Sequence, residues 1–189
     1  AGDGSRLPAT LEMDGVVYDS VAIRYKGNIS FMIPENDGNP KYPLNIDMNE
    51  YIKGQNLMGY NKLKLGNLMT DPTTVREAVA YEIYRKYTVA PKSNMMKVNI
   101  GVVGQTATYY GVYSNTESIN KGFLESHFDS KNGPLAKCDP NPAAQDTVCD
   151  KSGLGNGIDG EQLSAQPDLK WYGPDSCQYY AIYAMKRDY

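Results

Sequence analysis

The stretch NKLKLGNLMTDPTTVREAVAYEIYRKY, residues 61–87, decides the fold, because it joins the clearest strand of the chain to its clearest helix. Its first half alternates in polarity, with Leu63 and Leu65 on one face and Lys62 and Lys64 on the other. Alternation of this kind is typical of a strand that is buried on one side only. We therefore predict a strand whose leucines point inward and whose lysines point outward.

The second half of this stretch predicts a helix. Asp71 is a good N-cap, and Pro72 suits the first helical position. Apolar residues then recur at helical spacing, which indicates an amphipathic helix over residues 75–87. These residues are Val75, Ala78, Val79 and Ile83. Arg76 and Glu77 project from its first turns.

The chain before residue 61 is dominated by strands. TLEMDGVVYDSVAIRYKG, residues 10–27, predicts a hairpin that turns at Asp14-Gly15, with alternation after the turn. Residues 32–40, MIPENDGNP, contain two prolines and a glycine and predict a loop. Residues 42–49, YPLNIDMN, alternate again and predict another strand.

Two further strands and a helix follow residue 91. The runs NMMKVNIGVVG, residues 94–104, and ATYYGVYSN, residues 107–115, predict paired strands with Gly104 near their turn. A second helix is predicted to open at Thr116, with apolar residues on one side. These are Ile119, Phe123, Leu124 and Phe128. The order β-β-β-β-α-β-β-α predicts an α+β fold, an antiparallel sheet with packed helices.

The character of the sequence changes at residue 129, so we expect a first region over 1–128 and a loop-rich second region over 129–189. Cys138 and Cys149 bracket a polar loop, and a disulfide there would add about 3 kcal/mol by closing it. Such a bridge indicates an oxidising compartment and leaves Cys177 over. The same region offers oxygen ligands for calcium, although their spacing does not fit an EF-hand, and a plain polar loop is the alternative. These ligands are Asp146, Asp150, Asn156, Asp159 and Glu161.

Composition argues against two classes of protein. The net charge of -3 argues against a dedicated nucleic-acid binder, and no apolar run approaches the length of a membrane span. The 16 tyrosines, against three phenylalanines and one tryptophan, fit a secreted or cell-surface protein. The sequence gives no indication of the oligomeric state.

AIRYKGNIS, residues 22–30, places two cations on one face of a strand, directly before Gly27-Asn28. Arg24 and Lys26 beside a glycine turn could hold a phosphate, and they could equally be solvated residues ahead of a turn. Asn28 also begins a formal N-glycosylation sequon.

Several segments, taken together and in order, resemble the CotH kinase-like family, which occurs in secreted bacterial and fungal proteins. The similarity extends over about residues 16–180, and its strength lies in the order of the motifs, since none of them is specific alone. The segments are IRYKGNIS (23–30), KYPLNIDMNEY (41–51), GYNKLKLGNLMTDPTTVREAVAYEIYRKYTVAP (59–91), YYGVYSNTESINKGFLESHF (109–128), NGPLAKC (132–138) and PDLKWYGPDS (167–176).

This resemblance implies the sheet-rich small lobe of an atypical protein kinase, with ATP, a divalent metal and a protein substrate. A kinase small lobe needs a strand lysine for the phosphates and a helix carboxylate to position it. The family pattern favours Lys41 with Glu77, and Lys62 and Lys64 are the alternatives. Glu117 would lie at a hinge near the adenine, and Arg24 and Lys26 would face the nucleotide. Each of these residues also has a plain structural interpretation, a solvated strand face for the lysines and a helix-dipole contact for Glu77.

The family's catalytic asparagine and aspartate segments have no counterpart before Tyr189, so we expect this chain taken alone to be inactive. Two functions from different classes remain open. The first is the N-terminal part of a secreted CotH-like kinase that phosphorylates secreted or surface proteins. The second is a non-catalytic extracellular protein that uses the same fold for adhesion or assembly with a surface partner.

Overall fold

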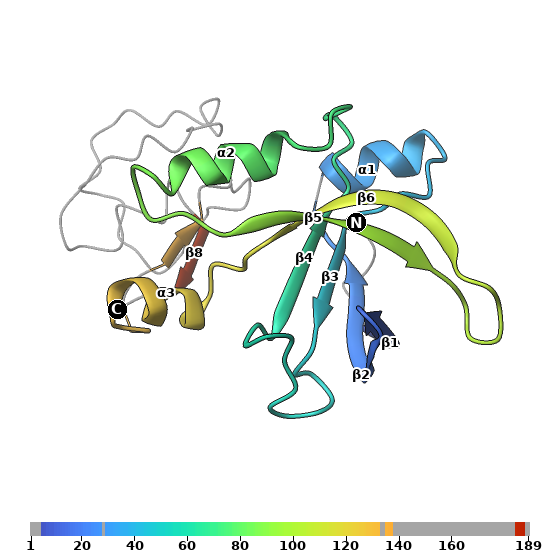
Figure 1. Ribbon diagram of the computed structural model, residues 1–189, viewed down its shortest axis with the longest axis horizontal. Coiled ribbons are helices and arrows are strands. Elements are labelled where there is room, and N and C mark those ends of the chain that lie inside the picture. Colours follow the sequence, from blue (N-terminus) through green and yellow to red (C-terminus); the bar gives the residue numbers. More distant parts are fainter. Residues whose placement is uncertain (1–4, 28, 133–134, 138–183, 188–189) are drawn as a thin grey trace, which may run out of the picture. The chain divides into compact units, whose positions relative to one another are not determined.

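The computed structural model describes residues 5–27, 29–132, 135–137 and 184–187. The chain divides into two compact units, residues 1–123 and 124–189. The first contains a six-stranded antiparallel sheet in the order β1-β2-β3-β4-β6-β5, and the second contains the antiparallel pair β7-β8 (Figure 1). The elements are β1 Leu7–Met13, β2 Val16–Tyr25, α1 Ile29–Asn36, β3 Leu44–Asp47, β4 Lys62–Gly66, α2 Arg76–Tyr84, β5 Ser93–Ile100, β6 Thr108–Thr116, α3 Lys121–Phe128, β7 Leu135–Lys137 and β8 Ala184–Arg187.

The predicted α+β class and the antiparallel sheet are confirmed. The predicted boundary at residue 128 stays a prediction, because most of the second region lies outside the described residues. The predicted Cys138–Cys149 disulfide, Cys177 and the five calcium ligands lie outside them as well.

One face of the sheet carries the hydrophobic core. Leu63 and Leu65 of β4 are buried, as their alternation with lysine predicts, and Ile46 of β3 pairs with Leu63. Val21 and Tyr113 add to the same cluster from β2 and β6. Burying each such side chain stabilises the fold by about 1.5–3 kcal/mol. Because the apolar side chains gather on this face, the opposite face is left to polar residues.

The β1–β2 hairpin turns at Asp14-Gly15, as predicted. Both residues have positive φ, 50° and 79°, which suits the tight turn of a two-residue hairpin. The register of the pair shifts between Ala9 and Leu11, and Ser20 on the facing strand also has positive φ. This irregularity interrupts the expected alternation, so Val17 is exposed while Val21 is buried.

The loop predicted over residues 32–40 is wrong for its first half, because Ile29–Asn36 form α1. Pro34 lies inside this helix and has no N–H to donate to the carbonyl of Ser30, four residues earlier. The Asn67 side chain takes the place of that donor, with its Nδ2 2.9 Å from Ser30 O and 3.0 Å from Lys41 O. A contact from a distant residue thus supports a helix that local sequence argues against.

The two later helices also begin elsewhere than predicted. α2 starts at Arg76, and its N-cap is Val75 rather than Asp71. Asp71 still serves the helix, because its Oδ2 accepts a hydrogen bond of 2.8 Å from the backbone N–H of Arg76. α3 starts at Lys121 instead of Thr116, since residues up to Thr116 remain paired in β6.

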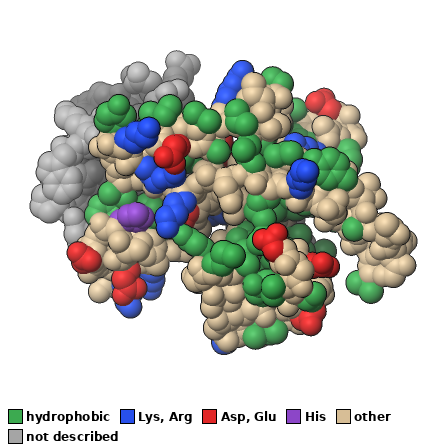
Figure 2. Space-filling model, in the orientation of Figure 1, with side chains coloured by type: hydrophobic (Ala, Val, Ile, Leu, Met, Phe, Trp, Pro, Cys, Tyr) green, Lys and Arg blue, Asp and Glu red, His purple; other side chains and the backbone are tan. Residues whose placement is uncertain are grey.

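The apolar side of α2 lies at the surface of the protein. Val79 and Ile83 are 51% and 48% exposed, and no residue of this helix is buried. Figure 2 shows hydrophobic side chains at the surface in the region of α2. The helix instead turns Glu77 and Tyr81 away from solvent. Its contact with the sheet is therefore polar at its first turn.

An ion-pair group anchors the end of β3. Asp47 is 5% exposed and accepts from Lys62 Nζ at 3.0 Å, with Arg6 Nη1 at 3.6 Å. Burial alone would raise the pKa of Asp47. The hydrogen bonds from Lys62 and the Asn49 N–H, together with the charges of Lys62 and Arg6, outweigh burial and lower that pKa.

We predict that Asp47→Asn lowers the free energy of unfolding by about 1–3 kcal/mol at pH 7, because two cations lose their carboxylate. Since the folded-state pKa is lowered, this contribution is present above the unfolded pKa of about 4 and is lost as pH falls through the folded value. Urea unfolding at pH 7 and pH 3 would measure it. Asp14→Asn, at an exposed turn, is the matched control, and equal stability of the two variants would contradict the prediction.

Candidate functional site

The polar face of the sheet carries a row of side chains across three neighbouring strands. Arg24 of β2 pairs with Asn45 of β3, which pairs with Lys64 of β4. Side chains at paired positions lie on the same face. Lys62 and Lys64 alternate with the buried leucines, so this row occupies the face opposite the core. Two cations and an amide thus project side by side from the sheet.

Glu77, in the first turn of α2, binds the same face of the sheet at β6, the strand beside β4. Its Oε2 accepts a hydrogen bond of 2.7 Å from Ser114 Oγ, and its Oε1 accepts one from Thr116 Oγ1. Ser114 is 1% exposed and pairs with Gly66 of β4. Both carboxylate oxygens are therefore held by hydroxyl groups of β6.

Gly66 makes room for this contact. A Cβ atom at that position would lie 2.5 Å from Ser114 Oγ and 3.5 Å from Glu77 Oε2. The first distance is far inside van der Waals contact. A glycine at the end of β4 is thus a condition for the carboxylate to reach β6.

Lys26 lies next to this group, one residue beyond the end of β2, where its backbone N–H donates to Pro43 O at 3.0 Å. Burial lowers the pKa of its ammonium, and the charge of Glu77 raises it in part. No carboxylate of the described residues lies within ion-pair distance of it. A partly desolvated cation that lacks a contact ion suits an anionic ligand.

The turn after Lys26 has the geometry that the sequence predicts. Gly27 has φ of +81°, in the left-handed region, and α1 begins two residues later. Arg24 Nη1 donates to Tyr25 O at 3.3 Å. Asn28, with its predicted sequon, lies outside the described residues.

Lys41 lies in the loop before β3. Its Nζ is 5.3 Å from the centre of the Tyr113 ring, and Gly111 of β6 allows the side chain to approach. Burial lowers its pKa. Of the two lysines, Lys26 is thus the one whose ammonium responds to Glu77.

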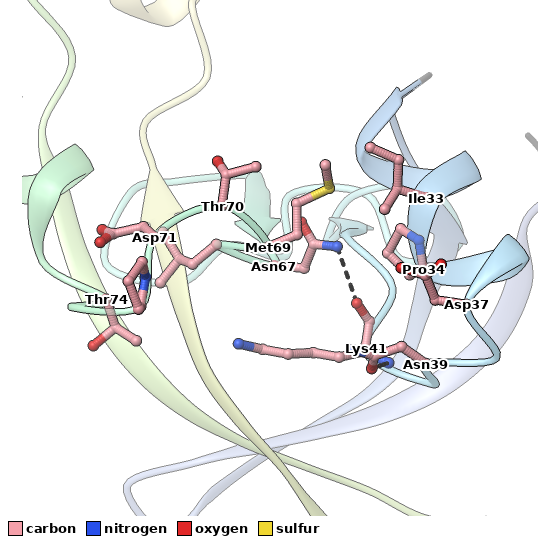
Figure 3. A pocket seen from close by; sticks show the side chains of 12 residues that line it. Ile33, Pro34, Asp37, Asn39, Lys41, Asn67, Met69, Thr70, Asp71 and Thr74 are labelled. Carbon is pink, nitrogen blue, oxygen red and sulfur yellow. Dashed lines mark hydrogen bonds between the residues drawn. The ribbon is translucent and has the colours of Figure 1, made fainter.

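The Lys41 side chain extends into a hollow of about 420 Å³ between α1 and the loop that leads to α2 (Figure 3). Asn67 lies beside it and binds the Lys41 carbonyl group, as the figure shows. Asp71 also lines the hollow, but its carboxylate is engaged by the N–H groups of Thr73 and Arg76. The hollow therefore combines one cation with two acidic side chains, Asp37 and Asp71.

Glu117 follows β6 directly and lies outside any helix. Its Oε2 accepts from the Lys92 N–H at 3.0 Å, and its own N–H donates to Lys92 O at 2.8 Å. These bonds extend the pairing of β5 with β6. A role at the adenine stays a prediction.

A metal does not fit the described residues by themselves. Within them no group of three or more His, Cys, Asp or Glu side chains could hold an ion. The predicted calcium ligands lie outside that part of the chain.

Sequence reasoning missed the hydroxyl pair and the glycine. Ser114 and Thr116 are two apart and alternate with the buried Tyr113, so alternation placed them on the polar face. Their partner could not be read from the chain, because Glu77 is almost forty residues earlier.

The chain belongs to the CotH kinase family, since the family model described as CotH kinase protein matches residues 23–171. This confirms the family that the motifs indicated. Comparison with curated proteins and with solved structures found no match. Resemblance to a kinase small lobe therefore stays a prediction.

We predict that Gly66→Ala destabilises the protein, because its methyl group would displace Ser114 from Glu77. The expected loss is about 1–3 kcal/mol, the range for overpacking. The double variant Gly66→Ala, Ser114→Ala removes the clashing oxygen and should recover part of it. Thermal unfolding of the two single variants and the double variant would complete a double-mutant cycle. If the two single-variant losses in free energy of unfolding simply add in the double variant, the assigned clash is contradicted.

We also predict that Glu77→Gln lowers the pKa of Lys26 further, because the carboxylate now favours its charged form. NMR titration of the lysine side chains would measure the change. Glu82→Gln, on the exposed side of the same helix, should leave Lys26 unchanged. A Lys26 pKa that does not respond to Glu77→Gln would contradict the proximity of the two charges.

Proposed function

We propose that the polar face of the sheet binds the phosphates of ATP for phosphoryl transfer to a secreted or surface protein. The observation that carries this proposal is the Glu77 carboxylate, which is anchored to the sheet and whose charge raises, against the effect of burial, the pKa of the half-buried Lys26 ammonium. A lysine positioned by a helix carboxylate is what a protein kinase uses to hold nucleotide phosphates. Membership of the CotH kinase family supports the same reaction.

The residues of this chain would act mainly through charge. Lys26 would contact a phosphate oxygen, and the neighbouring Arg24 and Lys64 would offset the remaining negative charge. The charge of Glu77 would favour the protonated form of the Lys26 ammonium. ATP, when bound, would supply the phosphoryl group to a hydroxyl group of the protein substrate, with ADP as the leaving group and the hydroxyl proton released to solvent. The described residues include no metal site, so no step is assigned to a metal.

Secretion forms part of the proposal and rests on the tyrosine-rich composition and on the cysteine pattern. No helix in the described part of the chain is long and apolar enough to span a membrane.

We predict that Lys26→Met weakens binding of ATP with Mg²⁺ at least tenfold, because a desolvated cation facing the phosphates is lost. Isothermal titration calorimetry of the full chain would measure the dissociation constant. Lys97→Met removes the same charge from an exposed position on β5 and should leave affinity unchanged. Absence of ATP binding by the unmodified protein, or an equal effect of both variants, would contradict the proposal.

A second candidate function, a non-catalytic surface or assembly protein, is favoured by the tip of the β5–β6 hairpin. Val103 there is fully exposed, and the neighbouring Val102 is exposed as well. The hairpin extends well past the shorter strands of the sheet (Figure 1). Self-association that disappears in Val102→Ser, Val103→Ser, measured by sedimentation, would favour this candidate.

A further inference from the structure

α2 is held to the sheet by polar contacts. No residue of the helix is buried, and its apolar stripe of Val75, Val79 and Ile83 is exposed. In most proteins a helix of this length depends on an apolar face packed against the core. The position of α2 must therefore come mainly from hydrogen bonds.

The hydrogen bonds between α2 and the sheet converge on Glu77. Ser114 Oγ donates to one carboxylate oxygen and Thr116 Oγ1 donates to the other. Ser93 Oγ lies 2.9 Å from Thr116 Oγ1. The Thr116 hydroxyl group has one proton and donates it to Glu77, so Ser93 must be the donor in that contact. A chain of hydroxyl groups from β5 and β6 thus ends at the carboxylate.

This arrangement differs from the ion pair that positions the helix in protein kinases generally. There the strand lysine itself contacts the helix glutamate. In this protein neither oxygen of Glu77 requires a lysine, and Lys26 lies near enough to sense its charge without an ion-pair contact. Since no side chain among the described residues accepts from the Lys26 ammonium, its donors are available for another ligand.

We infer that Ser114 and Thr116 are positioning residues, a hydroxyl latch that docks α2 on the sheet through Glu77 before any nucleotide arrives. The latch rests on the proposed function only for its effect on nucleotide binding; docking of the helix is independent of it. Because both oxygens of the Glu77 carboxylate are already held, this side chain loses no further conformational entropy when the ligand binds. The latch thus makes the site preorganised.

The test uses the full chain with a matched set of substitutions. Thr116→Val keeps the shape of the side chain and removes the hydroxyl group, whereas Thr116→Ser keeps the hydroxyl group. Combining Thr116→Val with Ser114→Ala opens the latch completely. Thr108→Val, at the exposed far end of β6, is the control.

The first measurement is amide hydrogen exchange over residues 76–84 without nucleotide. We expect the double variant to speed exchange in α2 at least tenfold, with β3 and β4 unchanged, and Thr116→Ser to behave like the unmodified protein. The second is NMR titration of Lys26, whose pKa should fall in the double variant as the carboxylate moves away. A simple loss of packing would not change that pKa selectively.

Affinity for ADP with Mg²⁺ completes the test and should fall about tenfold in the double variant but less than twofold in Thr116→Ser. If the unmodified protein binds no nucleotide, the proposed function fails while exchange and the Lys26 titration still decide the latch. Unchanged exchange in α2, or an unchanged Lys26 pKa in the double variant, overturns the inference whether or not nucleotide binds.

Discussion

The contact between the Glu77 carboxylate and the hydroxyl groups of β6 is the constraint on which the candidate site depends. It fixes the first turn of a helix that has no buried residue, and it brings a negative charge next to Lys26. It also requires Gly66, since a side chain there would occupy the place of Ser114 Oγ. Helix position, local charge and the glycine are thus consequences of one interaction.

A second contact between residues distant in sequence, made by Asn67, positions the segments around Lys41. Asn67 supplies hydrogen bonds to the carbonyl groups of Ser30 and Lys41, and the first of these lacks its helical partner because of Pro34. The amide thereby joins α1, the loop before β3 and the exit of β4. The hollow into which Lys41 extends lies among these three segments (Figure 3). Loss of this amide would leave two part-buried carbonyl groups without their side-chain donor.

Most of the sheet could be predicted from the sequence, and its helices only in part. Alternation of Leu63 and Leu65 with lysine, and the Asp14-Gly15 turn, are local signals that the structure confirms. α1 was missed because Pro34 argues locally against a helix, and the Asn67 side chain that donates to Ser30 O comes from far along the chain. The outward stripe of α2 was misread because spacing shows that a helix has an apolar side but not which side faces the sheet. The pairing of Lys41 with Glu77 at a nucleotide stays a prediction; Glu77 binds Ser114 and Thr116, and the Lys41 ammonium lies over the Tyr113 ring.

The sequence by itself determined the family, the α+β class and the two-sided pattern of the strands, because each of these is written in residue order and local periodicity. Tertiary structure decided which lysine responds to the charge of Glu77, and it brought Ser114 and Thr116 to that carboxylate. These residues are far apart along the chain, and only the pairing of β4 with β6 brings their strands together. Charge interactions depend on distance in space, which a one-dimensional pattern does not contain.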